Sequence, residues 1–347
     1  MNIILPEWTK YDNLYKALKK SCKNVRWKTS VTQFEINALS NVSKLLEELK
    51  TNNYQLKPYT EFDVYEPKRR HIKATRIRDR VVQRSFCDNY FYPLITKSFI
   101  YDNCACQIGK GPDFATKRLK QHYRRFYNTY RNNHGWVLKC DIHHFFESIN
   151  HNILKQLLIK KNMDDFSLNF IFQIIDSFGE VGLGLGSQVS QLLALFYLNE
   201  LDHIIKEKFH IKAYIRYMDD FIIVHKDKET LLEILNFLKE YLPSIGLELN
   251  NKTILQPISK KVSFLKWKFT LTDSGKVLML VDGKEMTKKR HKVKAIINKY
   301  KNGQITKDQL DQSINGIMNH LSKGMTFNAR KNLNNFIKQN LNDKGDT

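Results

Sequence analysis

Two aspartates stand side by side in an apolar and aromatic run, the segment YIRYMDDFIIV at residues 214–224. The pattern predicts two short buried strands around a tight turn that carries Asp219 and Asp220. A hairpin tip can hold both carboxylates in water, so a solvated turn is the alternative interpretation of this pair. A second apolar run, VLKCD, also ends in an aspartate, Asp141. The three carboxylates are therefore candidates for one shared site.

Carboxylates at the ends of neighbouring strands repel one another, and at least one takes up a proton unless a cation lies between them. Mg²⁺ prefers hard oxygen ligands and binds one or two carboxylates together with substrate phosphates. Two such ions about 4 Å apart stabilise the attacking and leaving oxygens of a phosphoryl transfer. This pattern predicts two Mg²⁺ ions, with Mn²⁺ as a substitute, at Asp141, Asp219 and Asp220.

The composition favours a folded protein with a polyanionic partner. The chain has 347 residues, of which 42% are hydrophobic, and Lys plus Arg outnumber Asp plus Glu by 57 to 35, a net charge of +22. Such a charge repels itself unless it meets a polyanion, and nucleic acid is the commonest one. The sequence has no apolar run of about 18 residues, no secretion signal and no CxxC pair. These features predict a cytoplasmic protein with reduced cysteines and no membrane partner.

Local patterns predict the elements around these carboxylates. The first 55 residues are expected to be helical, Asn150 is expected to cap a helix, and a glycine-rich loop is expected to lead into a long helix. KETLLEILNFLKEYLPSIGLELN predicts a helix and then a strand, while KVSFLKWKF and KVLMLVDG predict one strand pair. From about residue 285 the pattern is helical and basic.

Several segments in this order resemble the boxes of reverse transcriptases. YMDD at 217–220 resembles their YxDD box, and DIHHFFESI resembles their first catalytic box. The remaining matches are GLGLGSQVSQLLALFYLNELD between these boxes, YEPKRRHIKATRIRDRVVQ in the fingers, and GLELNNKT and FLKWKF in the later palm. YxDD alone is a weak signal, but the ordered set over roughly residues 55–270 is specific. IYDNCACQIGKG and LGSQVSQ resemble bacterial enzymes of the diversity-generating retroelement and defence-associated types.

The resemblance implies an α+β fold, a right-hand polymerase with fingers, a palm built on an antiparallel sheet with packed helices, and a helical thumb. The expected boundaries are 1–135 for the fingers with N-terminal helices, 136–270 for the palm and 271–347 for the basic thumb. The implied activity is RNA-directed DNA synthesis, in which a 3′-hydroxyl is extended with deoxynucleoside triphosphates.

The resemblance also assigns roles residue by residue. Asp141 and Asp219 are the principal metal ligands, Asp220 is a nearby third carboxylate, and the Ile142 carbonyl is an extra ligand. Lys252 is expected to protonate pyrophosphate, although a surface lysine is an equally good interpretation. Lys68, Arg69 and Arg70 lie in the segment that contacts the triphosphate, and Arg70 is favoured because its planar fork suits phosphate oxygens. A solvated basic strand is the alternative for these three residues.

The nucleotide-binding residues follow from the same boxes. Phe146, five residues after Asp141, is the expected steric gate against a 2′-hydroxyl, with an ordinary core phenylalanine as the alternative. Phe145 is expected to face the core. Leu185 stands where many relatives carry a glutamine that touches the nucleotide and template. The rest of this substrate set is Gly186, Ser187, Gln188 and Gln191. Lys266 and Trp267 replace the usual Gly-Tyr pair of the primer grip.

The expected partners are an RNA template, an RNA/DNA duplex and deoxynucleoside triphosphates, and an accessory protein or structured non-coding RNA stays open. The biological setting is either a bacterial retroelement or anti-phage defence. Template-independent or protein-primed synthesis by the same site is an alternative, and so is a non-catalytic nucleic-acid-binding scaffold. The intact Asp141, Asp219 and Asp220 argue against the scaffold.

Leu185 predicts low fidelity, because an aliphatic side chain cannot make the hydrogen bond of the usual glutamine. The loss corresponds to about 1 kcal/mol of discrimination, or roughly five-fold in error rate. Leu185→Gln is therefore expected to lower the frequency of misincorporation by that factor, measured by sequencing the reaction products. An unchanged error rate would remove this explanation.

Overall fold

The structure is a computed structural model that describes residues 5–65 and 69–342. Its residues group into two compact units. The first comprises 1–111, 140–221 and 232–253, and the second comprises 112–139, 222–231 and 254–347. The candidate catalytic, metal-binding and substrate-binding residues belong to the first unit, whereas Lys266 and Trp267 belong to the second. Lys68 lies outside the described residues. The division into fingers, palm and thumb stays a prediction.

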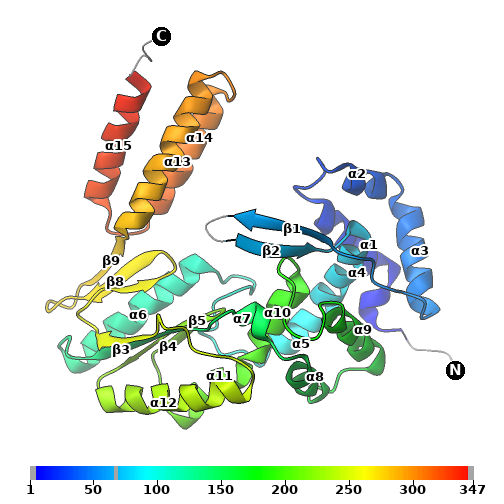
Figure 1. The fold of residues 1–347 in the computed structure, drawn as a ribbon, viewed down its shortest axis with the longest axis horizontal. Coiled ribbons are helices and arrows are strands. Elements are labelled where there is room, and N and C mark those ends of the chain that lie inside the picture. Colours follow the sequence, from blue (N-terminus) through cyan, green and yellow to red (C-terminus); the bar gives the residue numbers. More distant parts are fainter. Residues whose placement is uncertain (1–4, 66–68, 343–347) are drawn as a thin grey trace. The chain divides into compact units, whose positions relative to one another are not determined.

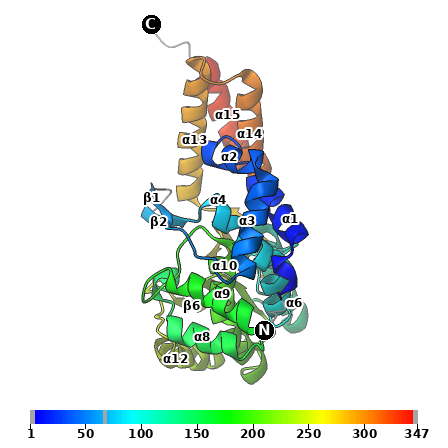
Figure 2. The same ribbon diagram turned by 90° about the vertical axis from the view of Figure 1, so that its right-hand side faces the viewer.

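The N-terminal part of the first unit is helical, as predicted (Figure 1). A 3₁₀ turn at Glu7–Thr9 precedes α1 (Tyr11–Cys22), α2 (Thr29–Ile36), α3 (Ala38–Lys50), α4 (Ile77–Phe86) and α5 (Tyr92–Thr96), with a π turn at Cys87–Phe91. Helix α1 packs against α3 and α4 (Figure 2). Between α3 and α4, the strands β1 (Thr60–Tyr65) and β2 (Arg69–Ala74) form an antiparallel hairpin in which Thr60 pairs with Ala74 and Tyr65 with Arg69.

The central elements carry the predicted carboxylates. They are β3 (Trp136–Asp141), α7 (Phe145–Ser148), α8 (His151–Ile159), α9 (Asp165–Asp176), α10 (Gln188–Tyr197), α11 (Asn199–His203), a π turn at Ile204–Lys208, β4 (Tyr214–Tyr217), β5 (Asp220–His225) and α12 (Lys228–Ser244). A four-stranded sheet has the order β4-β5-β3-β6, where β6 is Ile254–Pro257. Strand β6 pairs antiparallel with β3 in a register that joins Trp136 to Pro257.

Burial explains why the central strands read as continuous apolar runs. All four inner residues of β5 are buried, so both faces of this strand are covered. Helix α10 is buried at almost every position, which identifies it as a core helix of the first unit. As predicted, Asn150 caps α8, because its side-chain oxygen accepts hydrogen bonds from the amides of Asn152 and Ile153.

The second unit contains α6 (Pro112–Tyr130), a three-stranded sheet and a group of three helices. Strands β7 (Val262–Phe264), β8 (Trp267–Leu271) and β9 (Val277–Val281) form an antiparallel sheet in that order. Helices α13 (Gly283–Lys301), α14 (Lys307–Ser322) and α15 (Phe327–Asn342) lie side by side (Figures 1 and 2) around a core that includes Leu310, Leu321 and Leu333. The predicted C-terminal helices are therefore confirmed.

Three expected elements differ from the structure. KVSFLKWKF is not one strand, because Leu265 and Lys266 have φ angles of 49° and 70° and reverse the chain between β7 and β8. GLELN forms only a single antiparallel bridge, Ile142 to Leu249, and no strand. The expected long helix after the glycine-rich loop ends at Tyr197 and continues as the short α11 and a π turn. None of the helices in the described part of the chain is long and apolar enough to cross a membrane.

The β7–β8 turn yields a stability prediction. A residue other than glycine at a φ of 70° destabilises the folded state by about 1 kcal/mol. Lys266→Gly is therefore expected to raise the free energy of unfolding by about that amount. Urea denaturation measures the change. Lys260→Gly is the control, since Lys260 is exposed and has no positive φ, and it is expected to leave stability unchanged or lower it. The same increase in both variants would contradict the explanation.

Candidate active site

The tight turn predicted between the two strands is present, and its backbone is strained. Strand β4 ends at Tyr217, and β5 begins at Asp220. Met218 adopts a φ of 57°, a left-handed conformation that is uncommon for a long side chain. Asp219 follows directly in this turn, and both aspartates are half-buried rather than fully exposed. The simple interpretation of a solvated turn is therefore wrong for this pair.

A buried ion pair holds this turn. The guanidinium of Arg216 is fully buried and donates to both carboxylate oxygens of Asp202, at 2.7 and 2.5 Å. It also donates to the carbonyls of Met218 and Leu195, at 3.0 and 3.1 Å. The hydroxyl of Tyr214 donates to Asp202 at 2.6 Å. Burial opposes the charge of Arg216, but Asp202 outweighs it, so the pKa of the guanidinium is raised.

Asp219 lies in a field that disfavours its charge. Burial is the largest cause that raises the pKa of this carboxyl, and the negative charge of Asp141 raises it further. Its own amide, Arg70 and Arg216 each act in the opposite direction without reversing the shift. Asp141 ends β3, which neighbours β5 in the sheet. The structure thus brings Asp219, Asp141 and Arg70 within electrostatic reach of one another.

The segment after Asp141 is fixed by two backbone hydrogen bonds. The amide of Asn250 donates to the carbonyl of Asp141 at 2.7 Å, and the amide of His143 donates to Glu248 at 2.8 Å. These bonds flank Ile142, so its own carbonyl is not used in the bridge to Leu249. That carbonyl is therefore a suitable additional oxygen ligand beside Asp141.

Lys252 lies two residues after Asn250, whose amide donates to the Asp141 carbonyl. Its amide donates to the Asn250 side chain at 3.1 Å in a turn, and its side chain is exposed. The hydrogen bond from the Asn250 amide to the Asp141 carbonyl connects this turn to the end of β3. The geometry fits both the acid role and the surface alternative that the sequence left open.

The two described arginines of the fingers segment have different surroundings. The guanidinium of Arg69 pairs with Asp63 on the facing strand at 2.9 Å and is 70% exposed. Arg70 instead contributes to the field at Asp219. Because the Arg69 guanidinium already forms an ion pair with Asp63, Arg70 is the better candidate to bind an incoming anion.

Phe146 lies in the short helix α7, next to Phe145. Phe145 is buried with 3% of its surface exposed, as predicted, although the segment is helical rather than extended. Phe146 is half-buried, and its ring lies 5.7 Å from that of Phe145 at an angle of 72°. Part of the Phe146 side chain therefore remains exposed, which a fully packed core phenylalanine would not offer.

The glycine-rich loop between α9 and α10 forms backbone hydrogen bonds with both α7 and β2. The amide of Leu183 donates to the Phe146 carbonyl at 2.7 Å, and the amide of Lys73 donates to the Leu185 carbonyl at 3.1 Å. Gly182 has a φ of 83°, and a Cβ there would lie 2.8 Å from the Glu147 carbonyl oxygen. Gly186 has a φ of 118°. Glycine is thus required where the backbone passes closely between α7 and β2.

The residues after this loop divide between two environments. Ser187 caps α10, since its hydroxyl accepts from the Ser190 amide at 3.0 Å. Gln188 has a buried side-chain oxygen, Oε1, with no hydrogen-bond partner among the described residues. Gln191 is exposed, and its Oε1 accepts a hydrogen bond from the Cys106 thiol at 3.3 Å. Gln188 and Gln191 stand three residues apart on α10, so they lie near one another on the helix surface, and their role in binding stays a prediction.

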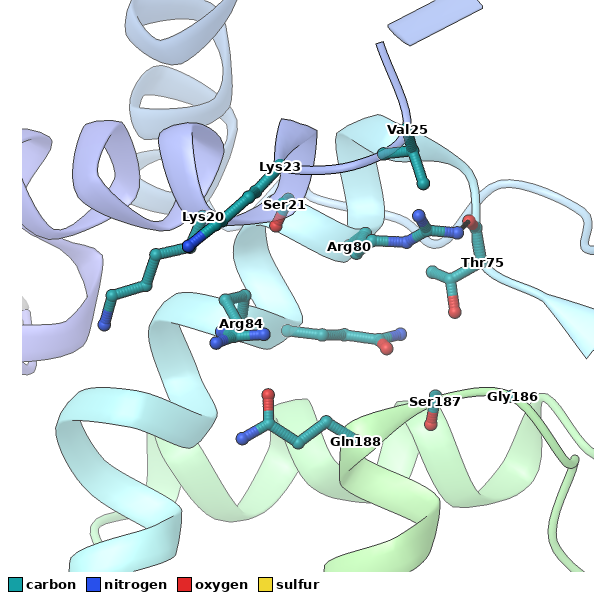
Figure 3. A pocket seen from close by; sticks show the side chains of 11 residues that line it. Lys20, Ser21, Lys23, Val25, Thr75, Arg80, Arg84, Gly186, Ser187 and Gln188 are labelled. Atoms are coloured by element: carbon teal, nitrogen blue, oxygen red, sulfur yellow. Dashed lines mark hydrogen bonds between the residues drawn. The ribbon is translucent and has the colours of Figure 1, made fainter. Parts of the chain in front are cut away.

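Sequence analysis missed two groups that the structure connects to these elements. Arg216 was not singled out, although a charge in an apolar run is itself a signal of a buried partner. Arg80 and Arg84 were not singled out, although their spacing of four residues places them on one face of α4. They line a cavity with Gly186, Ser187 and Gln188 (Figure 3).

The donor set fits divalent cations of the hard class. Asp141 and Asp219 supply carboxylate oxygens, and a cation between them relieves both causes that raise the pKa of Asp219. Among residues 5–65 and 69–342, no group of three or more His, Cys, Asp or Glu side chains is arranged to hold a metal ion. Two protein carboxylates completed by substrate phosphates is the usual arrangement for Mg²⁺.

Comparisons with known proteins agree with this geometry. The sequence profile described as "Reverse transcriptase (RNA-dependent DNA polymerase)" matches residues 12–269. A Saccharomyces cerevisiae relative, the "Putative COX1/OXI3 intron 2 protein", is 22% identical over 366 aligned positions that cover 82% of this chain and 40% of the relative. Telomerase from Candida albicans, solved with a fragment of telomeric RNA, superposes with a TM-score of 0.53 at 11% identity, covering 84% of this chain and 64% of the telomerase chain.

The structural likeness confirms the predicted fold class, an α+β right-hand polymerase fold with antiparallel sheets. The chain spans less than two thirds of the length of either relative.

The raised pKa of Asp219 predicts how this residue affects stability. The folded carboxyl binds a proton more readily than the unfolded one, so stability is lost as pH rises from below the unfolded pKa through the folded pKa. At pH 7 without divalent cations, Asp219→Asn is therefore expected to be more resistant to urea than the wild type. At pH 3 the difference is expected to disappear.

Millimolar Mg²⁺ extends this measurement. It is expected to stabilise the wild type more than Asp219→Asn, because only the wild type offers both carboxylates. A variant that is less stable than the wild type at pH 7, or equal stabilisation of both proteins by Mg²⁺, would contradict the electrostatic account.

Proposed function

The chain belongs to the reverse transcriptase (RNA-dependent DNA polymerase) family, and from this premise we propose that it is an RNA-directed DNA polymerase. It extends a 3′-hydroxyl with deoxynucleoside triphosphates on an RNA template and releases pyrophosphate. The observation that carries the proposal is the electrostatic coupling of Asp219 with Asp141 and Arg70. Carboxylates that hold divalent cations and a cationic side chain that binds the phosphates are recurring parts of metal-assisted phosphoryl-transfer sites.

Asp141 and Asp219 would hold the divalent cations, with Asp220 and the Ile142 carbonyl as further oxygen ligands. Bound Mg²⁺ would lower the pKa of the 3′-hydroxyl and neutralise charge on the leaving pyrophosphate. Arg216 fixes the carbonyl of Met218 and so sets the direction of the Asp219 backbone. The carboxylates are thereby held in place before the substrate arrives.

Arg70 would bind the triphosphate, because its charge acts on Asp219 and, among the described residues, it has no ion pair comparable to that of Arg69 with Asp63. Lys68, outside the described residues, and Arg69 would add positive charge near it. Lys252 would protonate the pyrophosphate as it leaves. These roles rest on the sequence boxes and on the geometry of Arg70.

Phe146 and the glycine-rich loop would select the nucleotide. The exposed part of the Phe146 ring would collide with a 2′-hydroxyl and so favour deoxynucleotides. Leu185 and Gly186 would approach the new base pair, with Ser187, Gln188 and Gln191 further along the same segment. The hydrogen bond between the Leu183 amide and the Phe146 carbonyl supports a coupled action of gate and loop.

The partners proposed are an RNA template and the RNA/DNA duplex that synthesis produces. The net charge of +22 and the basic helices of the second unit support binding to phosphate backbones. An accessory protein or structured RNA would fit the same charge. The Candida albicans telomerase structure contains telomeric RNA, which supports this class of partner by analogy only.

We further propose that the setting is a retroelement or an anti-phage defence system. The bacterial subtype rests on the segments IYDNCACQIGKG and LGSQVSQ alone. The yeast relative is by its name an intron protein, which supports a mobile-element setting more than a defence setting.

Primer extension on an RNA template tests the proposed activity. Asp219→Asn and Asp141→Asn are expected to lower nucleotide incorporation by about 100-fold or more, because each removes a carboxylate charge from the cation site. Asp12→Asn is the control, since Asp12 is exposed on α1 and forms no ion pair in the described part of the chain. Incorporation by Asp219→Asn at the level of Asp12→Asn would overturn the mechanism.

A further inference from the structure

One face of the β1–β2 hairpin (Figure 1) carries a network of ionisable side chains, those of Glu61, Asp63, Arg69 and His71. In the antiparallel register, Asp63 lies directly opposite His71. Directly opposed residues point to the same face of a hairpin, and successive residues along a strand alternate between faces. Arg69 and His71 therefore share the face of Asp63, and Arg70 between them lies on the other face.

The other face of the hairpin meets the glycine-rich loop. Ile72 forms a parallel bridge with Leu185, and a Cβ atom at Gly186 would lie 3.1 Å from the Ile72 side chain. Arg70 stands two residues before Ile72 and so shares its face, and the charge of Arg70 acts on Asp219. The network therefore lies behind the strand that presents Arg70.

Asp63 binds both neighbours of Arg70 in the chain. One carboxylate oxygen accepts from Nε of Arg69 at 3.0 Å, and the other lies 3.2 Å from Nδ1 of His71. The hydrogen bond from Arg69, and next the one from His71, lower the pKa of Asp63, so this carboxyl is ionised at neutral pH. The residues on both sides of Arg70 are therefore anchored to one carboxylate on β1.

His71 also contacts a second carboxylate, and this arrangement depends on its proton. The Nε2 atom of His71 lies 2.8 Å from a carboxylate oxygen of Glu61. A neutral imidazole has one N–H, whereas the imidazolium has two. Because ionised carboxylates only accept hydrogen bonds, His71 donates to both Glu61 and Asp63 only when it is protonated. The hydrogen bond to Glu61, followed by the one to Asp63, accordingly raises the pKa of His71.

The charges around His71 belong to the hairpin itself. Both acidic side chains that contact it in the described part of the chain, Glu61 and Asp63, come from β1. On β2, Arg69 and Lys73 share its face, and the Lys73 ammonium donates to the Phe178 carbonyl at 3.4 Å. The His71 side chain is 51% exposed, so it exchanges protons with solvent. Solvent pH can therefore assemble or release the network.

We propose that His71 is a positioning residue for the incoming nucleotide and acts through Arg70. In its imidazolium form, His71 ties β2 to Glu61 and Asp63 and so fixes the strand on which Arg70 meets the triphosphate. This inference rests on the proposed function, because it takes Arg70 as the triphosphate ligand. A side chain that is held before its ligand arrives loses less conformational entropy on binding. Protonation of His71 is therefore expected to lower KM for the nucleotide and to leave kcat unchanged.

The raised pKa of His71 sets the direction of the pH dependence. The network is complete below the ordinary histidine pKa of about 6.5 and is lost as pH rises through the raised pKa of the folded protein. At pH 6 the wild type is expected to have a KM about three-fold lower than that of His71→Gln, and at pH 9 the two values are expected to converge. Primer extension at varied nucleotide concentration measures KM and kcat, and comparison at equal pH cancels the ionisation of the nucleotide.

His71→Arg is the conservative replacement. A guanidinium keeps its charge and can donate to two carboxylates throughout this range, so His71→Arg is expected to keep a low KM at pH 9 as well as at pH 6. His134→Gln is the matched control, because His134 is exposed in the second unit and forms no ion pair in the described part of the chain. Its KM is expected to follow the wild type at both pH values, and thermal melting verifies that each variant folds.

Asp63→Asn distinguishes support of β2 from competition with the triphosphate. This variant is expected to raise KM, because both neighbours of Arg70 lose their charged acceptor. A lower KM would overturn the proposal, since it would show that Asp63 withholds Arg69 from the triphosphate. A difference in KM between the wild type and His71→Gln that stays the same from pH 6 to pH 9 would also overturn it.

A measurement without catalysis separates this inference from the proposed activity. NMR titration of the His71 ring is expected to give a pKa above the ordinary histidine value, and Glu61→Gln is expected to lower it. No change of this pKa in Glu61→Gln would overturn the network even if the wild type extends primers. Primer extension with equal KM in the wild type and His71→Gln at pH 6 would overturn the inference alone. A network that responds to Glu61→Gln, without extension by the wild type, would instead overturn the proposed activity and with it the role of His71 towards a nucleotide.

Discussion

The ion pair between Arg216 and Asp202 is the interaction on which the candidate active site depends. Both side chains are fully buried, and removal of one partner from such a pair typically costs about 3–5 kcal/mol because the other charge is left uncompensated. The same guanidinium donates to the carbonyl of Met218, at a backbone conformation that long side chains rarely adopt. The buried guanidinium of Arg216 therefore fixes the backbone of the turn through the Met218 carbonyl, and this contact involves neither solvent nor substrate.

This arrangement contains an unfavourable electrostatic interaction that a bound cation would offset. Burial and the like charge of Asp141 both oppose the ionisation of Asp219. The position of Asp219 beside Asp141 therefore does not itself stabilise the fold. Arg70 offsets this only in part, and the pKa of Asp219 stays raised. Local features that lower stability without compensation inside the chain are typical of functional sites. The unfavourable field around Asp219 supports the proposed cation site together with the position of Asp141 at the end of the neighbouring strand.

Features that depend on neighbouring residues could be predicted from the sequence, and features that depend on distant contacts could not. The hairpin around Asp219, the strand that ends at Asp141 and the cap at Asn150 follow from apolar runs and local hydrogen bonds. The turn at Leu265 and Lys266 was missed because neither residue favours a positive φ. Asp202 as the partner of Arg216 was also missed, since fourteen residues separate them and only the fold brings them together.

The glycine-rich loop shows how one segment can couple several parts of a site. Its backbone bonds to Phe146 on α7 and to Lys73 on β2, three residues from Arg70. The same loop also lines, at Gly186, the cavity that Arg80 and Arg84 line, and Ser187 then caps α10. A bulkier residue at Gly182 would collide with the Glu147 backbone and push these supports apart. Glycine is therefore needed where this loop passes close to α7 and β2, since a residue with a side chain would not fit the positive φ and the short contact at Gly182.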